Sequence, residues 1–118
     1  MSWLVRDGDV LATVHEATSV PDRLRGLWHR PPPEGALVLR PPFVLHTVGL
    51  PYAVDVAFCG SAADGRMAVT EVVRLPPFRI ARPRLGAKVL VVAPDGAFER
   101  WRLAVGDELE ISGRDNGQ

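Results

Sequence analysis

The chain has 118 residues, 47% of them hydrophobic and 24% charged, which fits one globular domain and excludes a disordered chain or a low-complexity fibre. Fourteen Lys and Arg residues balance fourteen Asp and Glu residues, so no net charge attracts nucleic acid or an anionic membrane. A single cysteine, Cys59, excludes an internal disulfide, and Asp7 and Asp9 lie where a secretory signal needs an apolar run. No apolar run reaches the roughly 20 residues of a membrane helix. We therefore expect a cytoplasmic protein with no membrane association.

The first half of the chain predicts short strands, because prolines and glycines divide it into apolar runs of strand length. Arg6-Asp7-Gly8-Asp9 lies between apolar residues 3–5 and 10–14, and Asp-Gly is typical of a tight β-hairpin. In residues 19–26 a serine cap, a proline in the first turn and a final glycine predict a helix of one to two turns. Residues 36–39 and 43–47 are expected to be strands, separated by two prolines.

The second half continues the same pattern. Residues 52–59 alternate between two faces, and one of these faces carries a single charged side chain, Asp55. A loop containing Asp64-Gly65 joins this segment to residues 67–75, which predicts a second hairpin. Residues 88–92 form an unbroken apolar run, which indicates a strand buried on both faces. Residues 97–103 and 109–111 are expected to form a short helix and a last strand.

These segments together predict the architecture. We expect one mainly β domain over residues 1–112, built as a compact antiparallel sandwich or a jelly-roll-like barrel with one or two short helices. Residues 113–118 have too little apolar content to pack against a core. They are therefore expected to form a disordered C-terminal tail.

Several of these landmarks occur in an order that is known from one protein family. They are Ala17, Arg23, Gly26 and Leu27; His46-Thr47-Val48-Gly49-Leu50; Val54-Asp55-Val56-Ala57-Phe58; Asp64-Gly65; Leu75-Pro76-Pro77; and Val105-Gly106-Asp107. Over residues 10–111 this ordered set resembles the bacterial and archaeal family named domain of unknown function 192. The chain departs from the family near Trp28, where a methionine or similar residue is usual, and at residues 92–96, where a Leu-Pro-Ala-Gly run is common. The resemblance implies a compact, mainly antiparallel β fold with short helices and no established activity.

The first candidate site combines His46 and Thr47, which precede a bend at Gly49, with Asp55 on the next strand. A histidine beside an aspartate can hold a proton near neutral pH, and a glycine bend lets a ligand approach backbone donors. The structural alternative is that Asp55 accepts hydrogen bonds from amides of residues 46–50 or pairs with Arg23. We favour this alternative, because a buried carboxylate must be hydrogen-bonded whether or not it acts on a ligand.

A second candidate is a run of basic residues in a stretch, residues 72–94, that contains no acidic residue. Arginine donates two parallel hydrogen bonds to a phosphate or carboxylate, so the run could form a local anion-binding face. The alternative is a solvated loop, with Asp107, Glu108 and Glu110 neutralising part of its charge. The run consists of Arg74, Arg79, Arg82, Arg84 and Lys88.

No complete catalytic or metal-binding motif is present in the sequence. None of the four serines lies in a Gly-x-Ser-x-Gly elbow, and the three histidines and Cys59 lack the paired spacings of a zinc site. We therefore predict a non-catalytic binding or interaction module that needs no cofactor and binds an unknown protein or a small anionic ligand. The shallow site is expected to comprise His46, Thr47, Asp55, Arg23, Arg79 and Arg82.

Two other functions stay open. The first is a small enzyme in which His46 and Asp55 transfer a proton on an anionic substrate held by Arg79 or Arg82. The second is nucleic-acid binding through the basic run, which the zero net charge makes unlikely.

Overall fold

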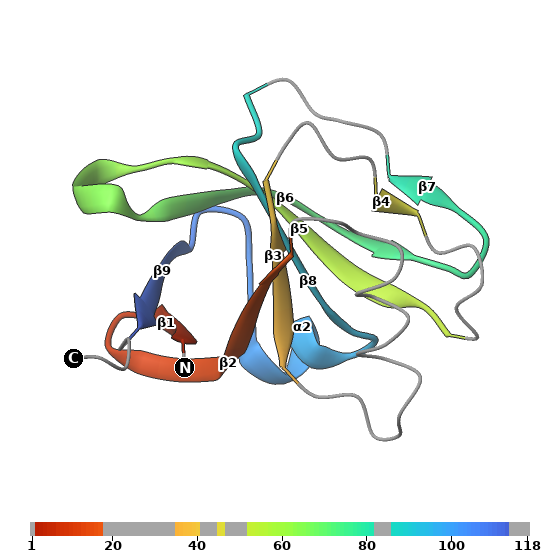
Figure 1. Cartoon of the computed structure of the whole chain (residues 1–118), viewed down its shortest axis with the longest axis horizontal. Helices are drawn as coiled ribbons and strands as arrows, with labels where there is room; N and C mark the ends of the chain where they lie inside the picture. Colours follow the sequence, from red (N-terminus) through yellow and green to blue (C-terminus); the bar gives the residue numbers. More distant parts are fainter. Residues whose placement is uncertain (1, 18–34, 41–44, 47–51, 82–85, 114–118) are drawn as a thin grey trace.

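The structure is a computed structural model, and it describes residues 2–17, 35–40, 45–46, 52–81 and 86–113. The fold is mainly β, as predicted, and seven strands close into a barrel in the order β1-β2-β3-β8-β5-β6-β9 (Figure 1). Two short strands, β4 (Leu45–His46) and β7 (Ile80–Ala81), pair in a separate antiparallel sheet. The barrel strands are β1 (Ser2–Arg6), β2 (Asp9–Ala17), β3 (Ala36–Leu39), β5 (Val54–Ser61), β6 (Met67–Leu75), β8 (Val89–Pro94) and β9 (Glu108–Gly113).

Both predicted hairpins are confirmed. Strands β1 and β2 are joined by Asp7 and Gly8, whose φ angles of 53° and 84° match the two positive values that a tight two-residue turn requires. Strands β5 and β6 are joined through η1 (Ala63–Gly65), a single 3-10 turn. The register between β5 and β6 shifts between Phe58 and Cys59, where Thr70 is an extra residue on β6 and forms a bulge. The Thr70 hydroxyl donates a hydrogen bond of 2.9 Å to the Phe58 carbonyl.

One strand pair differs from the antiparallel prediction. Strands β2 and β3 pair in parallel, from Val14 opposite Ala36 to Ala17 opposite Leu39. Parallel neighbours need a crossover of a dozen or more residues, and residues 18–35 provide that length. Gly113, the first residue of the predicted tail, belongs instead to β9, where it pairs with Ser2 of β1. The helix predicted within residues 19–26 and the rest of the predicted tail, residues 114–118, lie outside the described residues.

The strands bury side chains on both of their faces. The inner face fills the barrel with residues from all seven strands, including Leu4, Ala57, Val91 and Leu109, which we call the inner core. The outer face of β3, β5, β6 and β8 carries a second cluster that includes Phe58. The alternation predicted for residues 52–59 is therefore confirmed, and all six residues of β8 are buried, as its apolar run predicted.

The two ends of the barrel differ. Strands β5 and β8 are antiparallel, so β5 begins at the end where β8 stops, with Val54 opposite Pro94. At that end the chain continues into the short helix α2 (Ala97–Trp101), whose Ala97 and Phe98 are buried in the inner core. No α-helix covers the opposite end in the described part of the chain. Among the same residues, no helix is long and apolar enough to span a membrane.

Candidate functional site

Asp55 stabilises the start of helix α2. The cap residue of this helix is Gly96, which has no side chain to bond the free amides of the first turn. One oxygen of Asp55, Oδ2, accepts hydrogen bonds from the amides of Gly96 and Phe98, both at 3.1 Å. Asp55 is 7% exposed and is the one buried charged residue in the described part of the chain. The structural interpretation of Asp55 is therefore supported, but the amides involved are those of residues 96 and 98 and not those of residues 46–50.

The surroundings of Asp55 alter its acidity in opposing directions. Burial raises the pKa of the Asp55 carboxyl above its ordinary value of 3.8, and the charge of Asp95 raises it further. The hydrogen bonds from Phe98 and Gly96, together with the positive charge of Arg74, lower the pKa but do not cancel the effect of burial. Both bonds go to one oxygen, so the carboxylate has the geometry of a helix cap.

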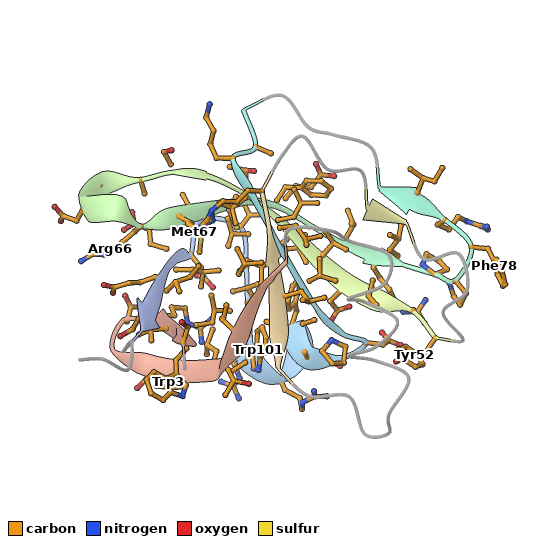
Figure 2. The ribbon with its side chains drawn as sticks, in the orientation of Figure 1. Trp3, Tyr52, Arg66, Met67, Phe78 and Trp101 are labelled. Carbon is orange, nitrogen blue, oxygen red and sulfur yellow. The ribbon has the colours of Figure 1, made fainter. Side chains whose placement is uncertain are left out.

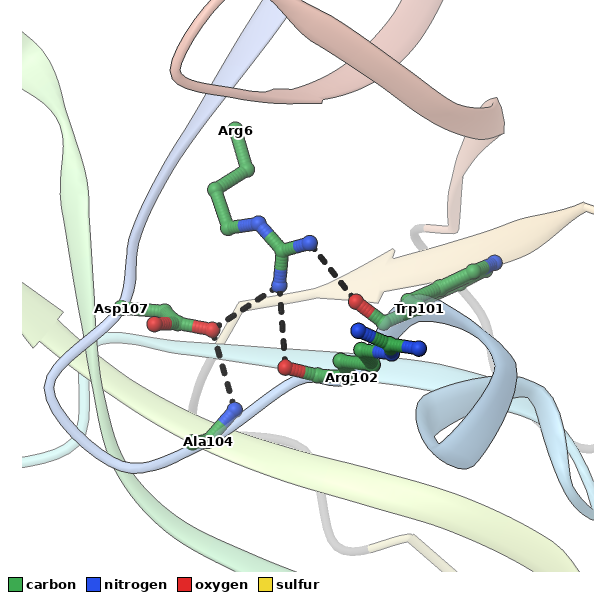
Figure 3. Close-up of polar contacts among 5 residues, drawn as sticks. All are labelled: Arg6, Trp101, Arg102, Ala104 and Asp107. Carbon is green, nitrogen blue, oxygen red and sulfur yellow. Dashed lines mark hydrogen bonds and ion pairs between the residues drawn. The ribbon is translucent and has the colours of Figure 1, made fainter.

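A second charged side chain holds the other end of α2 (Figure 3). The guanidinium of Arg6 on β1 donates hydrogen bonds to the carbonyls of Trp101 at 2.6 Å and Arg102 at 3.2 Å. It also pairs with Asp107 at 3.0 Å, and the same Asp107 oxygen accepts a bond from the Ala104 amide. Cations near the last carbonyls of a helix are favourable, so Arg6 and Asp55 together fix α2 across this end of the barrel.

A cavity of about 520 Å³ lies at the other end of the barrel. The ends of β3, β5, β6 and β8, the loop between β5 and β6, and the middle of β9 all contribute to its wall. We call this space the mouth cavity. Its volume falls within the range of about 300–1,000 Å³ that is usual for small-molecule sites, and the mouth of a barrel is a common place for one.

The floor of the mouth cavity is apolar, because inner-core side chains at this end of the barrel form it. Met67 and Val89 line it and are 7% and 8% exposed, the highest values among the buried members of that core. Ile111, which packs against the same core, also lines the cavity. The core is therefore least completely covered at this end.

The rim of the mouth cavity is charged. Its side chains include three cations, Arg40, Arg66 and Lys88, and two carboxylates, Asp64 and Glu110, which leaves one net positive charge. All five residues are exposed. In Figure 2, Met67 lies nearer the barrel than Arg66, which is at the outer side of the hairpin of β5 and β6. An anionic group at the rim and an apolar group on the floor would both find suitable surroundings.

Arg66 separates the mouth cavity from an acidic depression. Its Nη1 is 3.4 Å from Oε1 of Glu108, and both side chains are 45% exposed. Arg66 also lines a smaller depression of about 230 Å³ together with Asp7, Glu108 and Glu110. An exposed pair at this distance contributes little stability, so the Arg66 side chain can leave Glu108 at low cost.

The structure describes three of the six predicted site residues. Asp55 lies in the barrel wall, as described above. His46 belongs to β4, and its backbone pairs with Ile80 of β7, the residue that follows Arg79 in the sequence. Arg79 is exposed and donates a bond of 3.5 Å to the Phe78 carbonyl. In Figure 2, Phe78, which precedes Arg79 in the sequence, lies far along the long axis from Arg66, which lines the mouth cavity. Arg23, Thr47 and Arg82 lie outside the described residues.

The described basic residues of the second candidate do not form one face. Arg74 is at the α2 end of the barrel, where two of its nitrogens bind the two oxygens of Asp95 at 3.0 and 3.1 Å. Lys88 is at the mouth cavity. The acid that neutralises Arg74 is thus Asp95, and not Asp107 or Glu108, which pair with Arg6 and Arg66. The hydrogen bond from Arg74 lowers the pKa of Asp95.

Nucleophilic and metal-binding groups do not converge in the described part of the chain. Burial raises the pKa of the Cys59 thiol to about 12, so at neutral pH this sulfur is protonated and a poor nucleophile. No group of three or more His, Cys, Asp or Glu side chains among the described residues could hold a metal ion.

The sequence alone does not indicate the mouth cavity, although Lys88 belongs to the predicted basic run. The lining residues come from four strands, β5, β6, β8 and β9, together with Arg40 directly after β3, and only the folded sheet brings them together. The available signal was local: Lys88 directly precedes the buried run of β8, and Arg66 directly precedes β6. A cation at the start of an apolar strand indicates where that strand reaches solvent.

Comparison with known proteins gives a fold-level relationship. No family model matches the chain, and no curated protein matches it significantly. The chain is similar to a solved structure from Sinorhizobium meliloti 1021, which is described as a proposed transcription regulator. The two share 19% sequence identity and superpose with a TM-score of 0.68, over 92% of this chain and 90% of the other. At this identity the similarity shows a shared fold.

Proposed function

We propose that this protein is a non-catalytic binding module that holds a small anionic ligand in the mouth cavity. The observation that carries the proposal is the difference between the two ends of the barrel. One end is closed by α2, which Asp55 and Arg6 fix in place. The other leaves a cavity of about 520 Å³ with an apolar floor and with three cations, Arg40, Arg66 and Lys88, at its rim.

The positions of the reactive groups favour binding over catalysis. Asp55 uses one oxygen to cap a helix, and the Cys59 thiol is buried with a raised pKa. The rival enzyme would need His46 and Asp55 to face the same substrate. His46 belongs to the separate sheet of β4 and β7, whereas Asp55 belongs to the barrel and bonds α2. The jelly-roll-like strand order and the resemblance to domain of unknown function 192 remain predictions.

The test is a binding panel followed by ligand-observed NMR. The panel contains acetate, hexanoate, inorganic phosphate and pyrophosphate, with hexanol and hexylamine as neutral and cationic counterparts. We expect at least one anion to bind more tightly than both counterparts. Lys88→Gln should weaken that binding about three- to tenfold, because it removes one partly solvated charge contact. Equal binding of anions and their counterparts would contradict the proposal.

Arg100→Gln is the matched control for Lys88→Gln. Arg100 is an exposed cation on α2, at the closed end of the barrel, so its loss changes the total charge equally but leaves the mouth cavity intact. Anion affinity should be unchanged in this variant. A decrease as large as that of Lys88→Gln would mean that the anion responds to overall charge alone.

A duplex DNA oligonucleotide in the same panel tests nucleic-acid binding, which the description of the structural neighbour raises. We expect weak binding that is lost as salt rises, because the chain has no net charge. Sequence-specific binding that persists in moderate salt would favour this function over the small-ligand module.

A further inference from the structure

We infer that the mouth cavity selects a singly charged amphipathic anion, a monocarboxylate with a short apolar chain, and disfavours polyanions such as pyrophosphate or nucleotides. This inference rests on the proposed function and adds the ligand class. It follows from how charge and apolar surface are distributed around the cavity.

The charge of the rim limits the charge of the ligand. Three cations and two carboxylates line the cavity, and a third carboxylate, that of Glu108, lies 3.4 Å from Arg66, so the rim has little positive charge in excess. A second or third negative charge would lie near Asp64 or Glu110 without a further cation to offset it, and like charges at short range repel. A phosphate-binding site would instead present cations or backbone amides without carboxylates between them.

Arg66 and Lys88 are suited to hold the carboxylate. Arg66 can exchange its 3.4 Å contact with half-exposed Glu108 for a ligand oxygen, because that contact is weak and solvated. The exchange would leave Glu108 beside the acidic depression with Asp7 and Glu110, in contact with solvent. Lys88 reaches the same rim from the start of β8, where its backbone amide is fixed by a 2.8 Å bond to the Cys59 carbonyl.

The apolar floor requires an apolar part in the ligand. Met67 and Val89 are the most exposed of the buried inner-core residues, and Ile111 lines the same cavity. If the ligand has an alkyl chain of a few methylenes, this chain would lie on the floor and shield the core side chains from solvent. Each methylene that is fully removed from water contributes about fourfold in affinity, so chain length should matter strongly.

The experiment compares dissociation constants for propionate, hexanoate, inorganic phosphate and pyrophosphate. We expect hexanoate to bind at least about tenfold more tightly than propionate, since three additional methylenes reach the floor. Pyrophosphate should bind more weakly than hexanoate. Equal affinities for propionate and hexanoate, or tighter binding of pyrophosphate, would overturn the inference while leaving the proposed function intact. Failure of every anion to bind would instead remove the proposed function itself.

Two variants test which residues determine the preference for hexanoate over propionate and pyrophosphate. Ile111→Thr keeps a branched side chain at the partly exposed wall but makes it polar, so hexanoate should weaken about three- to tenfold while propionate changes less than twofold. Glu110→Gln removes one carboxylate from the rim, so pyrophosphate should gain more affinity than hexanoate. Equal gains for the two anions would show that Glu110 does not discriminate between them, which would contradict the inference. Thermal melting of each variant establishes that it is folded before binding is measured.

Discussion

Asp55 is the residue that links the sequence to the closed end of the barrel. The side chain reaches two amides more than forty positions further along the chain, at Gly96 and Phe98. Because Gly96 supplies no capping side chain, no neighbour in sequence can replace this contact. The carboxylate therefore acts as a cap provided by another strand.

We predict that Asp55→Ala lowers the free energy of unfolding by about 1 to 3 kcal/mol, because two buried amides lose their acceptor. Asp55→Asn should cost less, since its amide oxygen can take the place of Oδ2 and accept both bonds. Urea unfolding of both variants measures the difference. Asp9→Ala, which removes an exposed carboxylate in the first hairpin, is the control and should change stability by less than about 0.5 kcal/mol. An Asp55→Ala protein as stable as the parent would show that the capping contact is not structural.

The raised pKa of Asp55 also predicts a pH dependence. The unfolded carboxyl titrates at its ordinary value of 3.8 and the folded one at a higher pH, so between these values the folded chain binds more protons. The stability that Asp55 contributes relative to Asp55→Asn is then fully present below 3.8 and is lost as pH rises through the folded pKa. Urea unfolding of both proteins from about pH 3 to about pH 7 tests this. A stability difference that grows with pH would mean that the folded pKa is lowered.

At the scale of elements, the short helix α2 depends on side chains from other strands. A helix of five residues is too short to be stable alone, so packing of Phe98 and the contacts at its two ends must hold it. The Phe98 ring also lies 5.5 Å from that of Trp101, centroid to centroid. These contacts fix the element that closes the barrel.

Arg6→Ala is predicted to lower the free energy of unfolding by about 1 to 2 kcal/mol, because it removes three hydrogen bonds, two of them to carbonyls at the end of α2. Arg66→Ala is the matched control, since it removes an arginine whose ion pair is longer and half-exposed. Its effect on stability should stay below about 0.5 kcal/mol. Equal losses in the two variants, measured by urea unfolding, would contradict the role given to Arg6.

Much of the strand pattern could be predicted from the sequence, because strand periodicity and Asp-Gly turns are local signals. The hairpin at Asp7-Gly8 and the doubly buried strand β8 are examples. The parallel pairing of β2 with β3 could not be predicted, since it depends on how the barrel closes. The bulge at Thr70 of β6 also depends on pairing with β5, and it changes which β6 side chains face the interior.

The candidate site was harder to predict than the fold. Asp55 stood out because it is a charge on a strand of apolar residues, but its partners at residues 96 and 98 are distant in sequence. The mouth cavity combines residues from four strands with Arg40 after β3, and these residues form no motif in the sequence. Lys88 was grouped with Arg74 by sequence proximity, although the barrel places the two at opposite ends.

At the scale of the whole molecule, the barrel is closed at one end and open at the other. The closed end, or base, is formed by α2 with the side chains of Asp55 and Arg6, and the open end is the mouth cavity above Met67 and Val89. The contacts that stabilise the fold and the residues that we propose bind the ligand therefore lie at opposite ends of the barrel. Changes at the base should alter melting without altering ligand selectivity, and changes at the rim should do the reverse.

The most direct test is an NMR titration of the ¹⁵N-labelled protein with hexanoate, which records the shift of each backbone amide. We predict that the largest shifts occur at residues 60–67, 88–89 and 110–111, around the mouth cavity, and that residues 96–102 of the closed end stay unchanged. Largest shifts at residues 78–81 or 96–102 would place the binding site elsewhere and contradict the account.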